Sequence, residues 1–290
     1  MRGGQYQVLL LLKGLRERGH ESILLARKKG PLSIAATNAG FTVRTAGPSE
    51  LWQRSVEADI VHAHDARAHA IAAIASRGRF VVSRRVAFPV GRSLVSTWKY
   101  ERAARFLAVS NFVAMQLRTV GVSEAKIDVV YDGVEVIEDV AAWNSEHPAV
   151  AIASYDPQKG RDLIEEAARL AGLRVVFSDN LSGDLRQASM FIYITRSEGL
   201  GSAALIAMNV GVPVIASRIE GLNEVFEDGV SGTFVTNDPH EIAGAMRRVV
   251  EQPGLAHKLI VGGRNRVRER FTQDHLVART LLSYERALAA

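Results

Sequence analysis

The sequence contains no cysteine, and its apolar runs are short. Without cysteine the chain has no disulfide framework, no zinc–thiolate site and no thiol nucleophile. Apolar runs such as 8–12 and 203–208 are far shorter than the ~20 residues that span a bilayer, and no basic stretch followed by an apolar core opens the chain. We therefore expect a cytoplasmic protein, at most peripheral at the cytoplasmic face of the membrane.

Proline is scarce, with 8 residues, and the excess of positive charge is small. The 290 residues carry 36 basic and 31 acidic side chains, and a net charge of +5 is too small to indicate a nucleic-acid partner. Apolar residues make up 47% of the chain, which excludes disordered, collagen-like and coiled-coil proteins. At about 150 residues per domain, the length predicts two domains.

Helix-like and strand-like segments alternate along the chain. After an opening helix, strands are expected at 22–25, 41–45, 59–62, 79–82, 106–109, 127–131, 149–153, 173–177, 190–194 and 212–216. Helices are expected at 31–39, 49–57, 66–75, after Ser110, and at 160–171, 182–189, 201–209, 239–251, 254–268 and 273–289. Repeated βα units with apolar, β-branched strands indicate parallel sheets. We therefore expect an α/β protein with two Rossmann-like domains.

The first residues are unusual for a Rossmann-like domain, which normally begins with a central strand. Here Gly3 and Gly4 lead directly into a helix, so the first strand is expected to be missing. Backbone N–H groups at a helix start, together with the helix dipole, favour an anion such as phosphate. A flexible chain start is the alternative interpretation.

Two histidines and an aspartate lie where a ligand of an open α/β sheet binds, at the C-terminal end of strand 59–62. The imidazoles of His62 and His64 can hydrogen-bond a hydroxyl group or transfer a proton, although a structural role remains open. His62 and His64 share one strand face, whereas Asp65 points elsewhere. The sequence therefore predicts no metal site here.

Two loops of the second half carry groups suited to a phosphorylated sugar. Lys159 precedes helix 160–171, where its ammonium can meet a diphosphate, and a solvated loop lysine is the alternative. Glu198 follows strand 190–194 and can accept hydrogen bonds from sugar hydroxyls, and the glycines beside it let a ligand approach the backbone. The absence of Gly-x-Gly-x-x-Gly argues against a nicotinamide-dependent dehydrogenase.

The segment 77–105 concentrates positive charge, because Glu101 is its only acid among eight basic residues. Leu94, Val95 and Trp98 are interleaved with these basic residues. The combination is typical of a surface that contacts a membrane or an acidic acceptor. A solvated basic face is the alternative, and no nucleic-acid-binding motif accompanies the segment.

Taken in order, these segments resemble the retaining family-4 glycosyltransferases of GT-B fold, over nearly the whole chain. The resemblance is carried by Gly3-Gly4 and by 59–65, 107–110, 130–134, 159–160, 198–201, 211–217 and 221–224. It implies an acceptor-binding domain over 1–137, to which a C-terminal helix at 272–290 returns. It also implies a nucleotide-sugar-binding domain over 138–271, with the two domains facing a cleft.

The resemblance also implies roles for single residues. His64 would contact the donor sugar near the anomeric carbon, Lys159 the diphosphate and Glu198 the sugar hydroxyls, and these three are the expected catalytic residues. The expected donor-binding residues are Gly3, Gly4, Ser154, Lys159, Glu198, Gly199, Leu200, Gly201, Ser202 and Ile206. The acceptor candidates are His62, Asp65, Arg84 and Arg85.

The partners that the resemblance implies are a nucleotide sugar and a glycan or lipid-linked acceptor, with no nucleic acid. No metal or other cofactor is expected, because helix ends, lysine and arginine neutralise the diphosphate. The leaving phosphate is expected to help remove the proton of the acceptor, and stabilisation of that phosphate is the main catalytic contribution.

Two positions depart from the family pattern. Ser154 stands where the family has arginine, and Ile206 stands where it has a second glutamate that contacts the ribose. A hydrogen bond to a charged group contributes about 1.5–3 kcal/mol, so losing both is expected to weaken donor binding by roughly 100-fold or more. Compensating groups are expected among Arg161, Asn180 and Arg196. The segment 177–191 is also expected to lack a βα unit that is common in the family.

The leading hypothesis is therefore a retaining hexosyltransferase that acts in cell-envelope polysaccharide or glycolipid assembly. The alternative is a non-catalytic GT-B protein that binds a sugar or a partner and transfers nothing. The residues at 154 and 206 and the missing strand favour this alternative.

Overall fold

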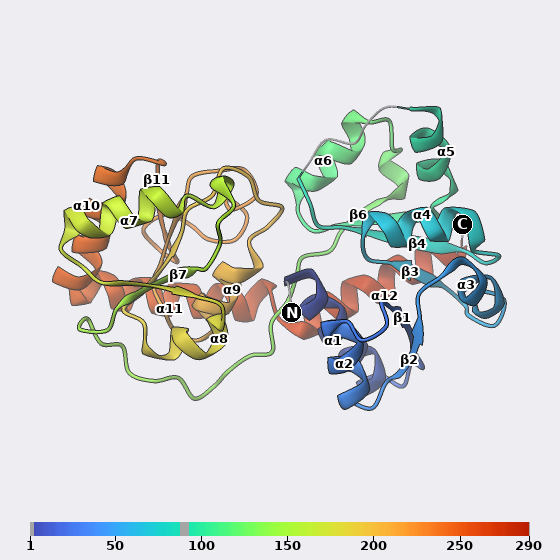
Figure 1. The fold of residues 1–290 in the computed structure, drawn as a ribbon, viewed down its shortest axis with the longest axis horizontal. Helices are drawn as coiled ribbons and strands as arrows, with labels where there is room; N and C mark the ends of the chain where they lie inside the picture. The colour runs from blue at the N-terminus through green and yellow to red at the C-terminus, as the bar shows by residue number, and fades with distance from the viewer. Residues whose placement is uncertain (1–2, 88–92, 290) are drawn as a thin grey trace. The chain divides into compact units, whose positions relative to one another are not determined.

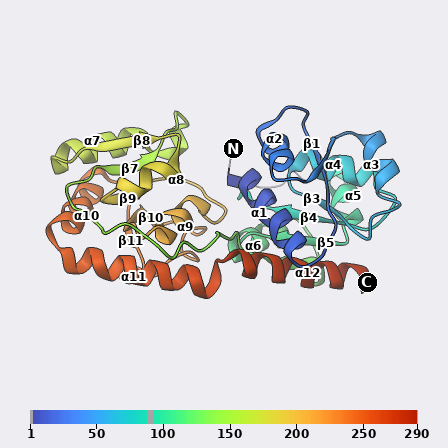
Figure 2. The ribbon, with the colours of Figure 1, turned by 90° about the horizontal axis from the view of Figure 1, so that it is seen from below.

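The computed structural model describes residues 3–87 and 93–289, which form two compact units of alternating parallel strands and helices (Figures 1 and 2). Unit 1 comprises Met1–Gly133 and Gln273–Ala290, and unit 2 comprises Val134–Thr272. The side chain of Gln7 donates to the carbonyl of Gly133 and accepts from its N–H, both at 2.9 Å. The N–H of Val134 instead donates to the carbonyl of Phe271. The chain therefore changes unit at Gly133, a few residues before the expected boundary at 137.

Unit 1 contains seven α-helices and six strands among its described residues. The strands are β1 (Ile23–Ala26), β2 (Thr42–Thr45), β3 (Val61–Ala63), β4 (Phe80–Arg84), β5 (Arg105–Ala108) and β6 (Ile127–Val129). The helices are α1 (Gly3–Glu17), α2 (Pro31–Asn38), α3 (Pro48–Arg54), α4 (Ala66–Ala75), α5 (Leu94–Arg102), α6 (Asn111–Thr119) and α12 (Gln273–Ala289). None of the helices in residues 3–87 and 93–289 is long and apolar enough to cross a membrane.

The strands of unit 1 form two parallel sheets, with the orders β1-β2 and β3-β4-β5-β6. Helix α1 contributes to the hydrophobic core of both. Leu11 belongs to the core cluster that includes Val81 of β4, whereas Leu12 belongs to the cluster that includes Leu24 of β1. Within the described residues no strand joins β1 to β3, so the two sheets of unit 1 are separate at that point.

Helix α12 belongs to unit 1 although it follows unit 2 in the sequence. Val277 lies so close to α1 that a Cβ added at Gly14 would be 2.4 Å from its Cγ2. Asp128 of β6 binds Arg286 of α12 at 2.7 Å and Arg105 of β5 at 2.5 Å. Close packing and this ion-pair network fix the last helix on the four-stranded sheet.

Unit 2 contains a single parallel sheet with the strand order β11-β10-β9-β7-β8. The strands are β7 (Ala149–Ile152), β8 (Val175–Ser178), β9 (Met190–Tyr193), β10 (Val214–Ser217) and β11 (Thr233–Val235). The helices are α7 (Arg161–Ala171), α8 (Leu181–Asp184), α9 (Ser202–Asn209), α10 (Pro239–Glu251) and α11 (Pro253–Arg270). The helix expected at 182–189 is only the short α8 and a 3₁₀ turn, and the chain passes from the edge strand β8 across β7 to β9.

Local signals account for several helix starts. Ser110 was expected to cap a helix, and its Oγ accepts the N–H of Val113 at 3.1 Å, directly before α6. Helix α5 was not expected, yet Ser93 caps it in the same way through the N–H of Ser96 at 3.1 Å. Helix α5 could not be predicted from a pattern of buried apolar residues, because none of its residues is buried.

Candidate functional site

The carboxyl ends of β7 and β9 define a natural ligand site in unit 2. β8 pairs with one edge of β7, whereas β9, β10 and β11 follow on the other side, so the strand order reverses between β7 and β9. Ligands of open parallel sheets bind at such a reversal. The N–H of Arg196 in the loop after β9 donates to the carbonyl of Gln158 in the loop after β7, at 2.9 Å. The two predicted loops therefore lie against each other.

Lys159 and Glu198 form an ion pair in this site. The Nζ of Lys159 lies 2.9 Å from Oε2 of Glu198, and the two side chains are 28% and 22% exposed. The N–H of Gly199 donates to the other carboxylate oxygen, Oε1, at 3.1 Å. Both charged residues were predicted from the sequence, and the fold brings them together.

Tyr193, the last residue of β9, is a member of the site that the sequence analysis missed. Its hydroxyl donates to Oε2 of Glu198, the oxygen that also binds Lys159. Burial and the negative charge of Glu198 raise the pKa of Tyr193 well above its usual value, so the phenol keeps its proton and donates. The signal in the sequence that could have indicated this residue is its position, at the end of a strand and five residues before the candidate glutamate.

Glycine is required at two positions around this pair. Gly201, directly before α9, has φ +100°, and a Cβ there would lie 2.3 Å from Leu222. Gly160, directly before α7, has φ +56°, and a Cβ there would lie 2.5 Å from Ile194. Both backbones are left-handed and closely packed, so a side chain is excluded. Leu200 is only 2% exposed, which leaves its backbone rather than its side chain for a ligand.

The two positions that depart from the family pattern supply no charge. The Oγ of Ser154 accepts the N–H of Asp156 at 3.2 Å and thus shapes the loop after β7. Ile206 is half-buried on α9, and Ser202 begins that helix.

Arg161, one expected compensating residue, binds Glu165 at 2.8 Å. Its guanidinium also lies 4.1 Å from the ring centroid of Phe177.

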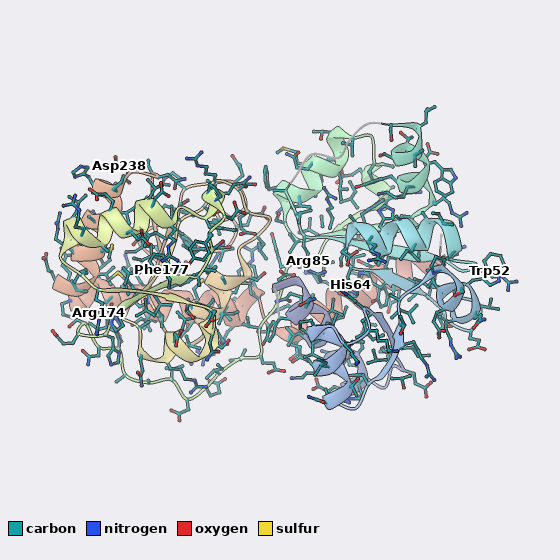
Figure 3. The ribbon with its side chains drawn as sticks, viewed as in Figure 1. Trp52, His64, Arg85, Arg174, Phe177 and Asp238 are labelled. Carbon is teal, nitrogen blue, oxygen red and sulfur yellow. The ribbon has the colours of Figure 1, made fainter. Side chains whose placement is uncertain are left out.

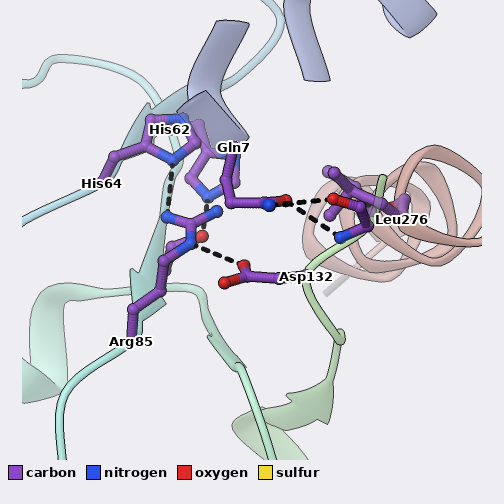
Figure 4. Close-up of polar contacts among 9 residues, drawn as sticks. Gln7, His62, His64, Arg85, Asp132 and Leu276 are labelled. Carbon is purple, nitrogen blue, oxygen red and sulfur yellow. Dashed lines mark hydrogen bonds and ion pairs between the residues drawn. The ribbon is translucent and has the colours of Figure 1, made fainter. Parts of the chain in front are cut away.

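A second polar cluster lies in unit 1, at the ends of β3 and β4 (Figures 3 and 4). The Nδ1 of His62 lies 2.7 Å from the hydroxyl of Tyr284 on α12, and its Nε2 lies 2.8 Å from Oγ of Ser83 on β4. The ring of His64 lies against that of His62, with 3.9 Å between the centroids. Both predicted histidines therefore belong to one cluster, in which His62 is held from both sides.

Arg85 connects His64 to a buried carboxylate (Figure 4). Its Nε lies 3.0 Å from Oδ1 of Asp132, and its Nη1 lies 3.3 Å from Nδ1 of His64. The side chains of Arg85 and Asp132 are 14% and 4% exposed. A guanidinium only donates, so we assign Nδ1 of His64 as an acceptor and place the ring proton on Nε2. Burial lowers the pKa of His64, and the neighbouring His62 and Arg85 lower it further, so the ring is neutral.

Other predicted residues of unit 1 lie around this cluster or outside it. Gly3 and Gly4 begin α1, and a Cβ at Gly4 would lie 3.9 Å from Cδ of Arg85, so the start of α1 adjoins the cluster. Asp65 lies outside it, because its carboxylate caps α4 and accepts the N–H of Ala68 at 2.7 Å. In the part of the chain that the structure describes, no group of three or more His, Asp or Glu side chains is placed to hold a metal ion.

The histidines make unit 1 sensitive to acid. Burial, followed by the charge of Arg85, lowers the pKa of His62 to about 3, and burial above all lowers that of His69 to about 4. In the unfolded chain both titrate near 6.5, so the unfolded chain binds more protons below that pH. The free energy of unfolding should therefore fall from about pH 6.5 toward pH 4, by up to ~1.4 kcal/mol per pH unit for each histidine.

Urea denaturation between pH 7 and pH 4.5, followed by circular dichroism, tests this dependence. The His62→Gln variant should show a weaker dependence of stability on pH than the wild type. Replacement of the exposed His257 by glutamine should leave the dependence unchanged. An equal pH dependence in the wild type and the His62→Gln variant would contradict the assignment.

Comparison with known structures identifies the fold. HepE from Anabaena, solved in complex with UDP and glucose, matches with a TM-score of 0.84 and 16% identity, covering 98% of this chain and 96% of that chain. Sucrose-phosphate synthase from Thermosynechococcus elongatus matches with a TM-score of 0.77 and 18% identity, covering 99% and 94%. The fold is GT-B, as expected from the sequence.

Comparison of sequences finds named relatives that match shorter parts of the chain. The D-inositol 3-phosphate glycosyltransferase of a Nocardioides species is 39% identical over 94 residues, which are 32% of this chain and 20% of that protein. An uncharacterized glycosyltransferase of Methanocaldococcus jannaschii is 29% identical over 136 residues, 44% of this chain and 35% of that protein. The chain therefore covers about a fifth to a third of the length of these relatives.

Two family models match consecutive regions of the chain. The model described as Glycosyltransferase Family 4 matches residues 1–137, and the model described as Glycosyl transferases group 1 matches residues 119–252. The first lies in unit 1 and reaches the start of unit 2, and the second covers the loops that hold Lys159 and Glu198. Between them the two models match residues 1–252, so this chain of GT-B fold is similar to the family-4 glycosyltransferases in both of its units.

Proposed function

We propose that this protein is a retaining glycosyltransferase that moves a sugar from a nucleotide-sugar donor to a cell-envelope polysaccharide or glycolipid acceptor. The observation that carries the proposal is the ion pair of Lys159 and Glu198 at the point where the sheet of unit 2 reverses its strand order. HepE was solved with UDP and glucose and with UDP-glucose, which supports a nucleotide sugar as the donor.

The ion pair suits a donor that carries both a diphosphate and a sugar. A diphosphate concentrates more negative charge than one carboxylate, so the ammonium of Lys159 moves from Glu198 to the diphosphate when the donor binds. Tyr193 and the N–H of Gly199 still hold Glu198 in place, and its carboxylate then accepts hydrogen bonds from sugar hydroxyls. Lys159 stabilises the negative charge that develops on the leaving phosphate.

In the proposed reaction the bond between the anomeric carbon and the diphosphate oxygen breaks, and the acceptor hydroxyl forms the new bond on the same face. The leaving phosphate oxygen takes the proton of the acceptor. His64 contributes a neutral N–H at Nε2, which is suited to a hydrogen bond with a sugar hydroxyl. Arg85 keeps that ring in its tautomer, and Asp132 holds Arg85. Because Lys159 itself supplies the positive charge at the diphosphate, we propose a reaction that needs no metal ion.

A panel of nucleotide sugars tests this function. We expect at least one donor to be hydrolysed slowly without acceptor, measured as release of the nucleoside diphosphate. With an acceptor, NMR of the product should show the same anomeric configuration as in the donor. Failure of every donor in the panel to bind or react would contradict the proposal.

A second candidate function is a GT-B protein that binds a sugar or a partner without transferring it. Ser154 and Ile206 favour it, because both replace charged groups of the family pattern. The same panel separates the two candidates. Donor binding without hydrolysis or transfer would support the second one.

A further inference from the structure

Helix α5 leaves a group of large apolar side chains in water. None of its residues is buried, and Leu94, Val95 and Trp98 are 91%, 73% and 42% exposed. The spacing of one, three and four residues places the three side chains on one side of the helix, which we call the α5 face. The helix lies on the outside of unit 1 (Figure 1). Contiguous exposed apolar groups of this kind mark interaction sites.

The other side of α5 is anchored, so the direction of the α5 face is fixed. The ring of Tyr100 stacks on that of Phe106, with 5.1 Å between the centroids. The Nε2 of His69 on α4 lies 3.1 Å from the carbonyl of Lys99, and the Nζ of Lys126 donates to the carbonyl of Glu101 at 2.8 Å. The helix is therefore held by the unit while its apolar residues point outward.

Positive charge surrounds the α5 face. The guanidinium of Arg102 lies 5.8 Å from the ring centroid of Trp98. Burial lowers the pKa of Lys99, and the nearby positive charge of Arg84 lowers it further, so two basic side chains lie near each other at the base of the helix. Glu101 is the only acid in the segment 77–105, of which residues 88–92 lie outside the described residues. The charge around the face therefore favours an anionic partner.

We propose that the α5 face docks unit 1 on an anionic phospholipid surface. Tryptophan sits at the level of lipid headgroups, aliphatic side chains enter the boundary with the acyl chains, and arginine and lysine bind the phosphates. Three side chains provide far less area than the ~800 Å² per partner of a stable protein–protein interface. A bilayer needs no such complementary area, because it adapts to a few inserted side chains. The proposal holds whether or not the protein transfers sugars.

Sedimentation of the full chain with lipid vesicles tests the proposal. We expect binding to phosphatidylcholine vesicles that contain about 30% phosphatidylglycerol, little binding to pure phosphatidylcholine, and weaker binding at high salt. Binding should shift the tryptophan emission to shorter wavelength, and the Trp98→Phe variant should lose that shift. The affinity of the double variant Leu94→Ser/Val95→Ser for these vesicles should be lower than that of the wild type by about tenfold or more.

A matched control is Ile74→Ser on α4, which removes another apolar side chain that is 69% exposed and should leave vesicle binding unchanged. Equal vesicle binding by the wild type and the double variant would overturn the proposal, as would no binding to the anionic vesicles. A self-association in solution that the double variant abolishes, without vesicle binding by the wild type, would assign the face to a second copy instead. Donor hydrolysis without vesicles should be equal in the double variant and the wild type, so this test is separate from that of the proposed function.

Discussion

Replacing Lys159 by alanine is expected to lower kcat/KM for donor hydrolysis by about 100-fold or more. A hydrogen bond to a charged group contributes about 1.5–3 kcal/mol, which corresponds to a factor of roughly 10 to 150. We expect a loss of kcat/KM at the upper end of this range, because the carboxylate of Glu198 then faces the diphosphate without a neighbouring positive charge. In the free protein the ammonium of Lys159 lies 2.9 Å from that carboxylate. The variant therefore removes an attraction and leaves a repulsion.

The matched control for Lys159→Ala is Arg169→Ala. Arg169 lies near the far end of α7, and its guanidinium is held by Glu166 at the surface. We expect its loss to change kcat/KM by about twofold or less, because exposed ion pairs of this kind contribute little. Thermal denaturation of both variants checks that the fold is kept. Equal kcat/KM values for the two variants would show that Lys159 does not bind the diphosphate.

Replacing Asp132 by alanine is expected to lower the free energy of unfolding of unit 1 by about 3–5 kcal/mol. The ion pair with Arg85 is almost fully buried, with 3.0 Å between Nε and Oδ1. Removing the carboxylate leaves the guanidinium buried beside the neutral ring of His64, without a negative partner. The loss of stability comes mainly from the guanidinium of Arg85, which stays buried without a partner of opposite charge, rather than from the lost attraction.

Urea denaturation of single and double variants tests this reasoning. The control Glu165→Ala breaks an exposed pair on α7 and should cost about 1 kcal/mol or less. The double variant Asp132→Leu/Arg85→Met should recover much of the loss, because it removes both buried charges. A loss for Asp132→Ala no larger than that of Glu165→Ala would contradict a buried pair at this position.

Elements with strong local signals were predicted at their observed bounds. Helices α4, α10 and α12 match the predictions at 66–75, 239–251 and 273–289. Asp65 caps α4, and Asp238 caps α10 through two N–H groups, so both starts are encoded within a few residues. Strand β11, with three residues from Thr233 to Val235, is too short for a periodic pattern and was missed.

The candidate site was predictable only in part, for a physical reason. Lys159 and Glu198 each stand in the loop that follows a strand, and the resemblance to the family named both. Their contact depends on the strand order, which pairs β7 with β9, and no local pattern encodes that order. The pairing of Arg85 with Asp132 likewise arises from the order of β4, β5 and β6. Single residue types indicated the chemistry, and the topology selected the partners.

Isothermal titration of UDP-glucose into the wild type and the Lys159→Ala variant tests the central claim most directly. If the loops after β7 and β9 form a nucleotide-sugar site, the wild type binds one donor per chain and the variant binds at least tenfold more weakly. If the donor of this protein has another sugar or another base than UDP-glucose, the same titration is made with other nucleotide sugars. Equal affinities of the two proteins for every donor, or no binding by the wild type to any of them, would contradict the assignment of this site.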